Sequence, residues 1–141
     1  MHKKLFFSAI LLMALALPHS LFAHDFSAVA PTGQTLYYNI NSDGVCVTHP
    51  GHGYDGDHPR PTGALTIPST VTYGDTTYSV TTIGFKAFEY CTGLTSVNIP
   101  SSVTSIGKNA FLRVKHIEYH GRATGSPWGA KTMNEMKNPK D

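Results

Sequence analysis

The sequence predicts a small, mostly β solenoid with short helical turns, built from about two and a half units of period 23 behind an N-terminal β-hairpin cap. Two repeated phrases and the alternation of apolar and polar residues around them carry this prediction. "IGFKAF" (Ile83–Phe88) returns at a spacing of 23 as "IGKNAF" (Ile106–Phe111), and "LTIPSTV" (Leu65–Val71) returns at a spacing of 32 as "VNIPSSV" (Val97–Val103). Because one unit has no second apolar face to pack against, the copies are expected to stack.

The two spacings differ by nine, which indicates an insertion in the first unit. "TYGDTTYSV" (Thr72–Val80) fills it, and apolar residues alternate with polar ones along this segment. Gly74-Asp75 at its centre suits a two-residue type II′ turn, in which glycine takes the first position. We therefore expect an inserted β-hairpin over residues 72–80.

A third, shorter copy begins at "VKHIEYH" (Val114–His120), where the apolar residues follow those of the previous unit at a spacing of 20. Periods in the low to high twenties are typical of leucine-rich repeats, in which each unit gives one short strand to a parallel sheet. Pro100 ends the strand of the second unit because it has no N–H to donate, and Gly107 allows a tight turn. The residues of this unit expected to face the core are Leu94, Val97, Ile99, Val103, Ile106, Ala110 and Phe111.

The segments on either side of the repeats are expected to close the ends of the solenoid. In residues 24–63, "TLYYNI" and "VCVT" are typical of the two strands of a hairpin with the four-residue turn "NSDG", followed by a His/Gly/Pro-rich loop. Residues 123–141 are predicted to form a C-terminal cap and, from Lys131, a mobile tail. Trp128 either covers the last layer of the core, which we favour, or is exposed for a partner.

A longer stretch of the second unit resembles a known family. "CTGLTSVNIPSSVTSIGKNAF" (Cys91–Phe111) is similar to the repeat of the BspA-like leucine-rich repeat family of bacterial surface proteins, whose units resemble "C..L..I.IP..V..IG..AF". The close resemblance covers roughly residues 64–119, and we assign residues 64–122 to the repeats. It implies an extracellular scaffold that adheres to a host or neighbouring-cell surface protein or glycan. The chain has barely two and a half units, where members of the family usually carry many.

Residues 1–23 have the pattern of a signal peptide. Lys3 and Lys4 precede an apolar run of 13 residues, and Ala23 ends a passable cleavage site. This run is shorter than the roughly 20 residues that cross a bilayer. We therefore expect a secreted or cell-surface protein without a membrane span.

Charge and cysteine content narrow the classes of partner. Without Lys3 and Lys4, nine basic and nine acidic residues remain, and they form no basic stripe that would indicate a nucleic-acid partner. Cys46 and Cys91 could form one disulfide outside the cell, but we favour two free thiols packed in the core.

The loop "HPGHGYDGDHP" (His49–Pro59) has the densest group of potential metal ligands in the sequence. We call it the histidine loop. His49, His52 and His58 are of the type that binds zinc or copper, but glycines and prolines leave them without a rigid support. We expect a solvated linker here and no bound metal or other cofactor. Cleavage after Ala23 would also let the amine and ring of His24 chelate copper, although its neighbours add no further ligand. No nucleophile elbow, phosphate-binding glycine loop or HExxH pair occurs, so the prediction is a protein that is not an enzyme.

The candidate binding residues lie on the outward face of the expected strands. They are Thr66, Ser96, Asn98, His116 and Glu118. His116 and Glu118 are two residues apart on one strand, which indicates a solvated pair rather than a catalytic dyad in a cleft. Three short strands about 4.8 Å apart cover on the order of 150 Å², whereas a specific interface takes about 800 Å² from each partner. A partner must therefore also contact other parts of the chain.

The leading functional hypothesis is an exported adhesion module that binds proteins or glycans. One alternative is a structural fragment of a longer repeat protein without activity of its own. The other, which the sequence favours less, is a metal-binding extracellular protein that uses the histidine loop.

The signal peptide leads to a direct test of the mature N-terminus. We expect the exported chain to begin at His24, or within a few residues of it, because the apolar stretch and its cleavage site end there. The intact mass of the secreted product checks this. A product that keeps residues 1–23 would contradict the interpretation.

Overall fold

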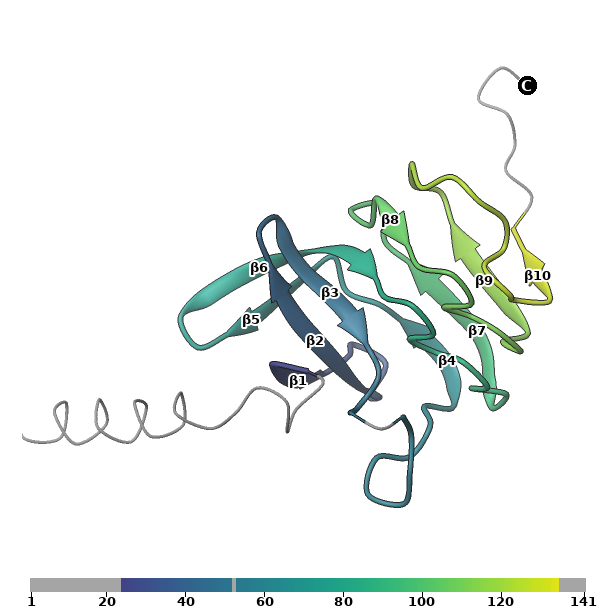
Figure 1. Ribbon diagram of the computed structural model, residues 1–141, viewed down its shortest axis with the longest axis horizontal. Coiled ribbons are helices and arrows are strands. Elements are labelled where there is room, and N and C mark those ends of the chain that lie inside the picture. The colour runs from purple at the N-terminus through teal and green to yellow at the C-terminus, as the bar shows by residue number, and fades with distance from the viewer. Residues whose placement is uncertain (1–23, 52, 135–141) are drawn as a thin grey trace, which may run out of the picture.

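The computed structural model describes residues 24–51 and 53–134 (Figure 1). These residues form ten β-strands in two sheets and contain no helix, so a mostly β fold is confirmed while the short helical turns are not. Turns rather than helices follow the strands of the repeats. The signal peptide predicted over residues 1–23 lies outside the described residues.

One sheet contains the repeat strands. β4 (Gly63–Thr66), β7 (Leu94–Ile99), β9 (His116–Tyr119) and β10 (Thr132–Met133) are arranged in the order β10-β9-β7-β4, and every pair is parallel. The paired residues are 32 apart between β4 and β7 from Ala64 onward (31 at Gly63, before a register shift), 20 apart between β7 and β9, and 16 apart between β9 and β10. A uniform period of 23 is therefore not confirmed for this sheet, because each coil closes with a different number of residues.

The strand β10 corrects one expectation. The chain from Lys131 was expected to be mobile because it is polar, yet Thr132 and Met133 pair with His116 and Ile117 of β9. This segment adds a short fourth strand after the last recognised repeat, and the strands succeed one another toward the C-terminal end (Figure 1).

The second sheet joins the cap to the repeats. It contains β1 (Phe26–Val29), β2 (Thr35–Asn41), β3 (Gly44–Thr48), β6 (Thr76–Ile83) and β5 (Thr70–Tyr73), and β8 (Ser105–Ile106) also pairs with β6. The expected cap hairpin is present as β2 and β3, but Asn41 pairs with Gly44, so its turn has two residues rather than four. β1, which the sequence analysis missed, pairs antiparallel with β2 and extends the hairpin to three strands.

The inserted hairpin is present as β5 and β6 and is longer than predicted. Tyr73 pairs with Thr76 across the turn, and Gly74 has a φ of 61°, as the first position of a type II′ turn requires. The second half of β6 leaves the hairpin to pair in parallel with β3 and β8. The same strand thus belongs to both the insertion and the first repeat.

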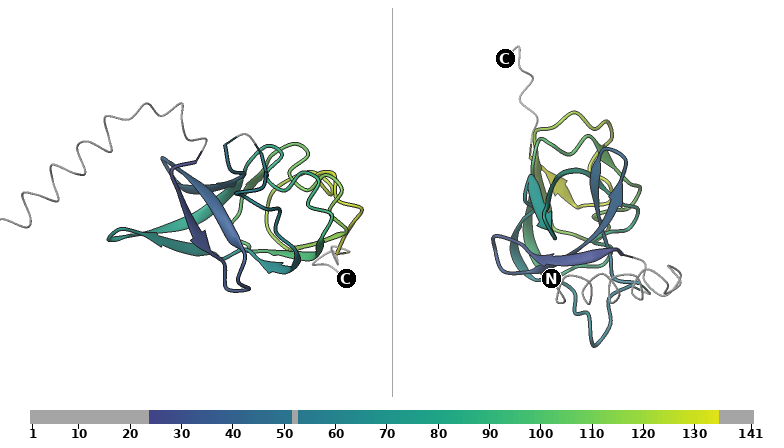
Figure 2. Two further views of the ribbon diagram at one scale, coloured as in Figure 1. Left: turned by 90° about the horizontal axis from the view of Figure 1, so that it is seen from below. Right: turned by 90° about the vertical axis from the view of Figure 1, so that its left-hand side faces the viewer.

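The core lies inside the stacked coils, which enclose it when viewed along the long axis (Figure 2, right). The expected core residues Leu94, Val97, Ile99, Val103, Ala110 and Phe111 are buried, and Ile106 is partly buried. Phe88 stacks on Phe111, its counterpart in the second unit, with ring centroids 5.5 Å apart and planes within 6°. Equivalent side chains therefore pack directly on each other from one coil to the next.

A backbone ladder links the turns on the side away from the repeat sheet. The Gly107 N–H donates to the Ile83 carbonyl at 2.8 Å, and the Gly84 N–H donates to the Val47 carbonyl of the cap at the same distance. A Cβ atom at Gly107 would lie 2.5 Å from the backbone nitrogen of Phe85. Glycine is needed at this position because two coils approach closely there, a stronger reason than the tight turn expected from the sequence.

Trp128 covers the last layer of the core, as favoured. It is 9% exposed, and its ring meets that of Tyr119 edge-on with centroids 5.7 Å apart. The Tyr119 hydroxyl donates to the Val103 carbonyl at 2.6 Å and accepts from the Ala123 N–H at 2.8 Å. The last coil is therefore held by both ring packing and hydrogen bonds.

Side chains bond to backbone groups of the repeat sheet that no strand occupies, at the edge strand β4 and at the end of β9 beyond its pairing with β10. At β4, Gln34 Nε2 donates to the carbonyls of Thr62 and Ala64, each at 2.9 Å, and the Thr66 N–H donates to the Thr32 hydroxyl at 3.0 Å. At β9, Asn134 accepts from the Tyr119 N–H at 2.7 Å and donates to the Tyr119 carbonyl at 3.0 Å. These bonds use backbone groups that would otherwise be open to another strand.

Adjacent residues of β7 lead to a stability prediction. Ile99 is 3% exposed whereas Asn98 is exposed, so Ile99→Asn should lower the free energy of unfolding by several kcal/mol (about 2 to 5 for the lost aliphatic, with more for an unpaired amide). Asn98→Ala should change it by less than about 0.5 kcal/mol. Urea denaturation of both variants measures the difference. Equal midpoints would refute the inward orientation of Ile99.

Candidate binding face

The five candidate residues come together on the outward face of the repeat sheet. Thr66 pairs with Asn98, and Asn98 pairs with Glu118, so these three side chains form one row across β4, β7 and β9. Ser96 pairs with Ala64, and the pairing of Val97 with Ile117 places Ser96 beside His116 in a second row. We call these five residues the strand face. That they bind a partner stays a prediction.

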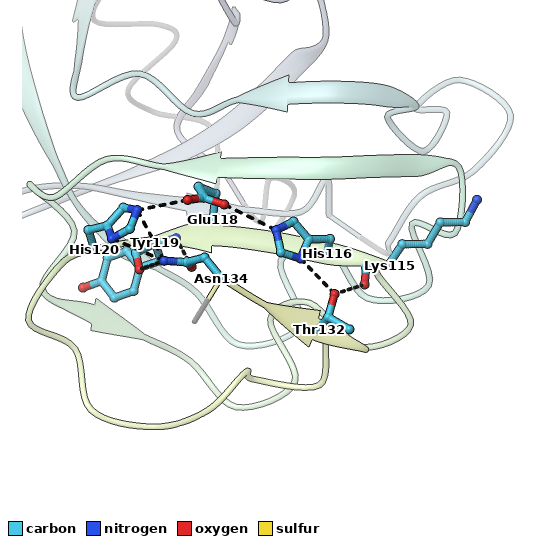
Figure 3. Close-up of polar contacts among 7 residues, drawn as sticks. All are labelled: Lys115, His116, Glu118, Tyr119, His120, Thr132 and Asn134. Atoms are coloured by element: carbon cyan, nitrogen blue, oxygen red, sulfur yellow. Dashed lines mark hydrogen bonds and ion pairs between the residues drawn. The ribbon is translucent and has the colours of Figure 1, made fainter. Parts of the chain in front are cut away.

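A chain of polar contacts runs along β9 and crosses to β10 (Figure 3). Glu118 lies between two histidines, with its Oε1 3.0 Å from His120 Nε2 and its Oε2 3.4 Å from His116 Nε2. On the other side of its ring, His116 Nδ1 is 2.8 Å from the Thr132 hydroxyl oxygen. The expected pair of His116 and Glu118 is thus part of a longer network.

His116 can take part in both ends of this network. If its Nδ1 donates to the Thr132 hydroxyl, that hydroxyl can donate its proton to the Lys115 carbonyl at 3.1 Å. If the hydroxyl donates to Nδ1 instead, Nε2 carries the ring proton and can donate to Glu118.

The two histidines stabilise the charged form of Glu118. Hydrogen bonds from His120 and then from His116 lower the pKa of the Glu118 carboxyl below its ordinary value of 4.5, and desolvation opposes them. The side chains of His116 and Glu118 are 36% and 42% exposed. This is a solvated pair at the surface rather than a dyad in a cleft, as the sequence indicated.

Three residues of this network were not among the predicted candidates. His120 follows Glu118 at a spacing of two, so the alternation His-x-Glu-x-His on one strand was a signal that could have found it. Thr132 and Asn134 come from the segment expected to be mobile. Their positions depend on the pairing of β10 with β9, and no sequence pattern around Thr132 predicts that pairing.

The histidine loop links β3 to β4 and is largely exposed to solvent, but it is also fixed to the first repeat. The Tyr54 hydroxyl donates to the Ala87 carbonyl at 2.6 Å, and burial raises the pKa of Tyr54. Asp55 Oδ1 accepts from the N–H of His58 at 2.8 Å and lies 3.0 Å from its Nδ1, while the His58 ring packs edge-on to Tyr37 at 5.9 Å. The loop is therefore held at two points.

The predicted metal candidates are placed separately. His49 Nδ1 faces the Pro50 carbonyl at 3.1 Å, whereas His58 is engaged with Asp55. His52 lies outside the described residues, and among the described ones no three His, Cys, Asp or Glu side chains are grouped as a metal site would need. The ring of His24 packs edge-on to Tyr37 at 4.9 Å.

Both cysteines are free thiols. Cys91 is buried, and burial raises the pKa of its thiol to about 12; burial also raises the pKa of Cys46. Because the thiolate is the reactive form, neither side chain is suited to act as a nucleophile near neutral pH.

Two hollows flank Arg60, beside the histidine loop. The larger, with a volume of about 460 Å³, lies between this loop and the turn that holds Gln34. The smaller, of about 230 Å³, lies between the loop and the turn after β6. The side chains that line the smaller one are His49, Tyr54, Arg60, Phe85, Lys86 and Glu89. We call the smaller hollow the loop pocket.

Comparison with known families agrees with this geometry. Residues 65–121 match the family model described as "BspA type Leucine rich repeat region (6 copies)". The repeat segment of this chain thus belongs to the BspA-type leucine-rich repeats, and the resemblance seen in the sequence is confirmed. A search of the curated proteins finds no match.

One solved structure supports the same fold, and two others are similar to this chain. A leucine-rich repeat protein from Bacteroides ovatus is 27% identical with a TM-score of 0.59, over 78% of this chain and 29% of that protein. A leucine-rich repeat protein from Bacteroides capillosus (25% identical, TM-score 0.49, 77% of this chain and 97% of that one) is also similar. A leucine rich cell surface protein from Faecalibacterium prausnitzii is similar too (27% identical, TM-score 0.48, 77% of this chain and 26% of that one). The fold assignment uses the first structure, and this chain spans about 29% of its length.

Within residues 24–51 and 53–134, no helix has the length and apolar character needed to cross a membrane.

The polar network leads to a pH prediction. His120→Ala removes the shortest hydrogen bond to the Glu118 carboxylate, so the pKa of Glu118 should rise toward 4.5. An NMR titration of the side-chain carboxyl carbon measures it, with His49→Ala as the control because that ring contacts Pro50 instead.

The sign of the linked effect on stability follows from the direction of the shift. A pKa that is lower in the folded state favours folding above the ordinary value of 4.5, and this contribution is lost as the pH falls through the folded-state pKa. The effect should be small because the group is well exposed to water. An unchanged Glu118 pKa in the His120 variant would show that the contact is absent in solution.

Proposed function

We propose that this chain is an exported binding module that adheres, at or outside the bacterial cell surface, to a protein or glycan of a host or neighbouring cell. The observation that carries the proposal is the polar outward face of the parallel sheet, on which Thr66, Asn98 and Glu118 form a continuous row. The signal-peptide pattern of residues 1–23 supports export. No enzymatic activity is proposed.

The backbone groups already occupied on β4 and β9 favour contact through the face of the sheet. Gln34 bonds to carbonyls at the edge strand β4, and Asn134 bonds to the backbone of Tyr119 at the end of β9. A peptide that adds a strand needs such groups free, so strand addition at these positions is disfavoured. A partner would instead meet side chains that stand outward from β4, β7 and β9.

The area of the face sets the expected mode of binding. With β10 included, four strands about 4.8 Å apart cover roughly 200 Å², against the roughly 800 Å² that a specific interface takes from each partner. One chain should therefore bind weakly through this face alone. Display in many copies would raise the overall affinity without new contacts.

A second candidate is a purely structural role within a longer repeat assembly. It is supported by the comparison with the Bacteroides ovatus protein, of which this chain spans 29%. Both roles need the same stacked core, so only a binding experiment separates them.

The test displays residues 24–141 at high density on beads and challenges them with host matrix proteins and glycans. We expect capture, and we expect a variant with Asn98→Arg and Glu118→Arg to lose it, because both changes put bulky charge on the strand face without touching the core. Asp43→Arg with Thr124→Arg is the matched control, since it changes the net charge equally at exposed positions on other elements.

Circular dichroism of each variant checks that the fold is kept. Capture that is equal in the two double variants would place binding elsewhere on the chain. No capture of any ligand at high valency would reject adhesion and favour the structural role.

A further inference from the structure

The first repeat exposes two aromatic rings where the second carries cations. Phe85 is 57% exposed and Tyr90 is 47% exposed. Their counterparts in the second repeat are Lys108 and Arg113. The turn conformation is the same in both units, since Lys86 and Asn109 both have a φ of 56°. Backbone geometry therefore does not demand the aromatic residues, and Phe85 borders the loop pocket.

The loop pocket is held in shape by contacts that do not involve a ligand. The hydrogen bond from the Tyr54 hydroxyl to the Ala87 carbonyl, at 2.6 Å, fastens the histidine loop to the first repeat. The guanidinium carbon of Arg60 lies 5.8 Å from the centre of the Tyr54 ring, within the range of a cation–π contact. Arg60 is thus held beside the hollow, and a ligand would not have to order the loop.

The charges that line the pocket favour an anion. Lys86 Nζ and Glu89 Oε1 are 3.6 Å apart and offset each other, which leaves the Arg60 guanidinium as the excess charge. A guanidinium binds a carboxylate through two parallel hydrogen bonds, which a lysine cannot reproduce. His49 adds a further polar group, because its Nδ1 faces Pro50 and its Nε2 is not part of that contact.

The remaining wall is the ring of Phe85, with Lys86 Nζ over it at 5.1 Å from the ring centroid. The exposed ring of Phe85 offers a surface on which the C–H face of a sugar ring can lie, and sites for small molecules combine such apolar walls with a few polar groups. The volume of about 230 Å³ is below the roughly 300 to 1,000 Å³ of sites for drug-sized ligands. The hollow therefore suits a single ring rather than a peptide segment.

We propose that the loop pocket binds one carboxylate-bearing sugar residue, with the carboxylate on Arg60 and the ring against Phe85. This goes beyond the proposed adhesion function, because the pocket is formed by other elements than the strand face. A ligand of this size in an open hollow should bind with a Kd of about 1 mM per site.

The test is an NMR titration of residues 24–141, labelled with ¹⁵N, using glucuronic acid as the probe and glucose as its uncharged match. Glucuronate should shift the amide signals of Phe85, Lys86 and Arg60, and glucose should shift them far less. Inorganic phosphate is added in a separate arm. Phosphate that binds as tightly as glucuronate would overturn the sugar assignment, because it would indicate a site for any small anion.

Two variants examine the two walls. Arg60→Gln should weaken glucuronate binding about tenfold or more, as expected when a charge-assisted hydrogen bond is lost, and Phe85→Ser should weaken it as well. Lys108→Gln is the matched control, because it removes a cation at the counterpart of Phe85 in the second repeat. Arg60 and Phe85 are exposed, so both variants should keep the melting temperature of the parent chain.

The result is independent of the adhesion experiment. The variant with Asn98→Arg and Glu118→Arg should bind glucuronate as the parent does, since neither residue lines the pocket. No shift up to about 20 mM glucuronate, well above the expected Kd, would overturn the proposal. Equal weakening by Arg60→Gln and Lys108→Gln would overturn it too, because it would indicate attraction by net charge alone.

Discussion

The stacking of each coil on the next is the constraint on which this fold depends, because no single coil can bury its own apolar face. Parallel strands join the coils on one side, and hydrogen bonds between turns join them on the other. The bond from Gly107 to Ile83 recurs as the bond from Gly84 to Val47 in the cap. The cap strand β3 therefore accepts a backbone hydrogen bond from the first repeat, just as the first repeat accepts one from the second. The sequence of β3 nevertheless has no repeat motif.

The ends of the stack show how a short solenoid can be closed. At the C-terminal end Trp128 covers the core, and at β4 and the end of β9 the side chains of Gln34 and Asn134 bond to the backbone as a further strand would. Side-chain amides suit this role because each has one acceptor oxygen and two donor protons, like a piece of backbone. These backbone groups of β4 and β9 are thereby occupied, while the outward face of the sheet stays available.

Sequence patterns predicted the parts of this fold that short-range chemistry determines. The hairpin at Gly74 follows from its turn residues, and the inward orientation of Ile99 follows from strand alternation. The strands β1 and β10 were missed, because a few ordinary residues become a strand only when a distant partner aligns with them. The same reason explains the candidate site: Asn98 and Glu118 were found from the repeat register, whereas Thr132 and Asn134 needed the pairing of β10.

The two proposed binding surfaces differ in how the stack supports them. The strand face has regular rows of short polar side chains, and the area of each row grows only when another coil is added. The loop pocket depends on a single irregular segment, the histidine loop, which the Tyr54 hydroxyl fastens to the turn after β6. A solenoid of this size cannot gain affinity by lengthening its face and still remain small. A pocket formed by an irregular loop can add chemical selectivity without adding further coils. The strand face alone is too small to provide that selectivity.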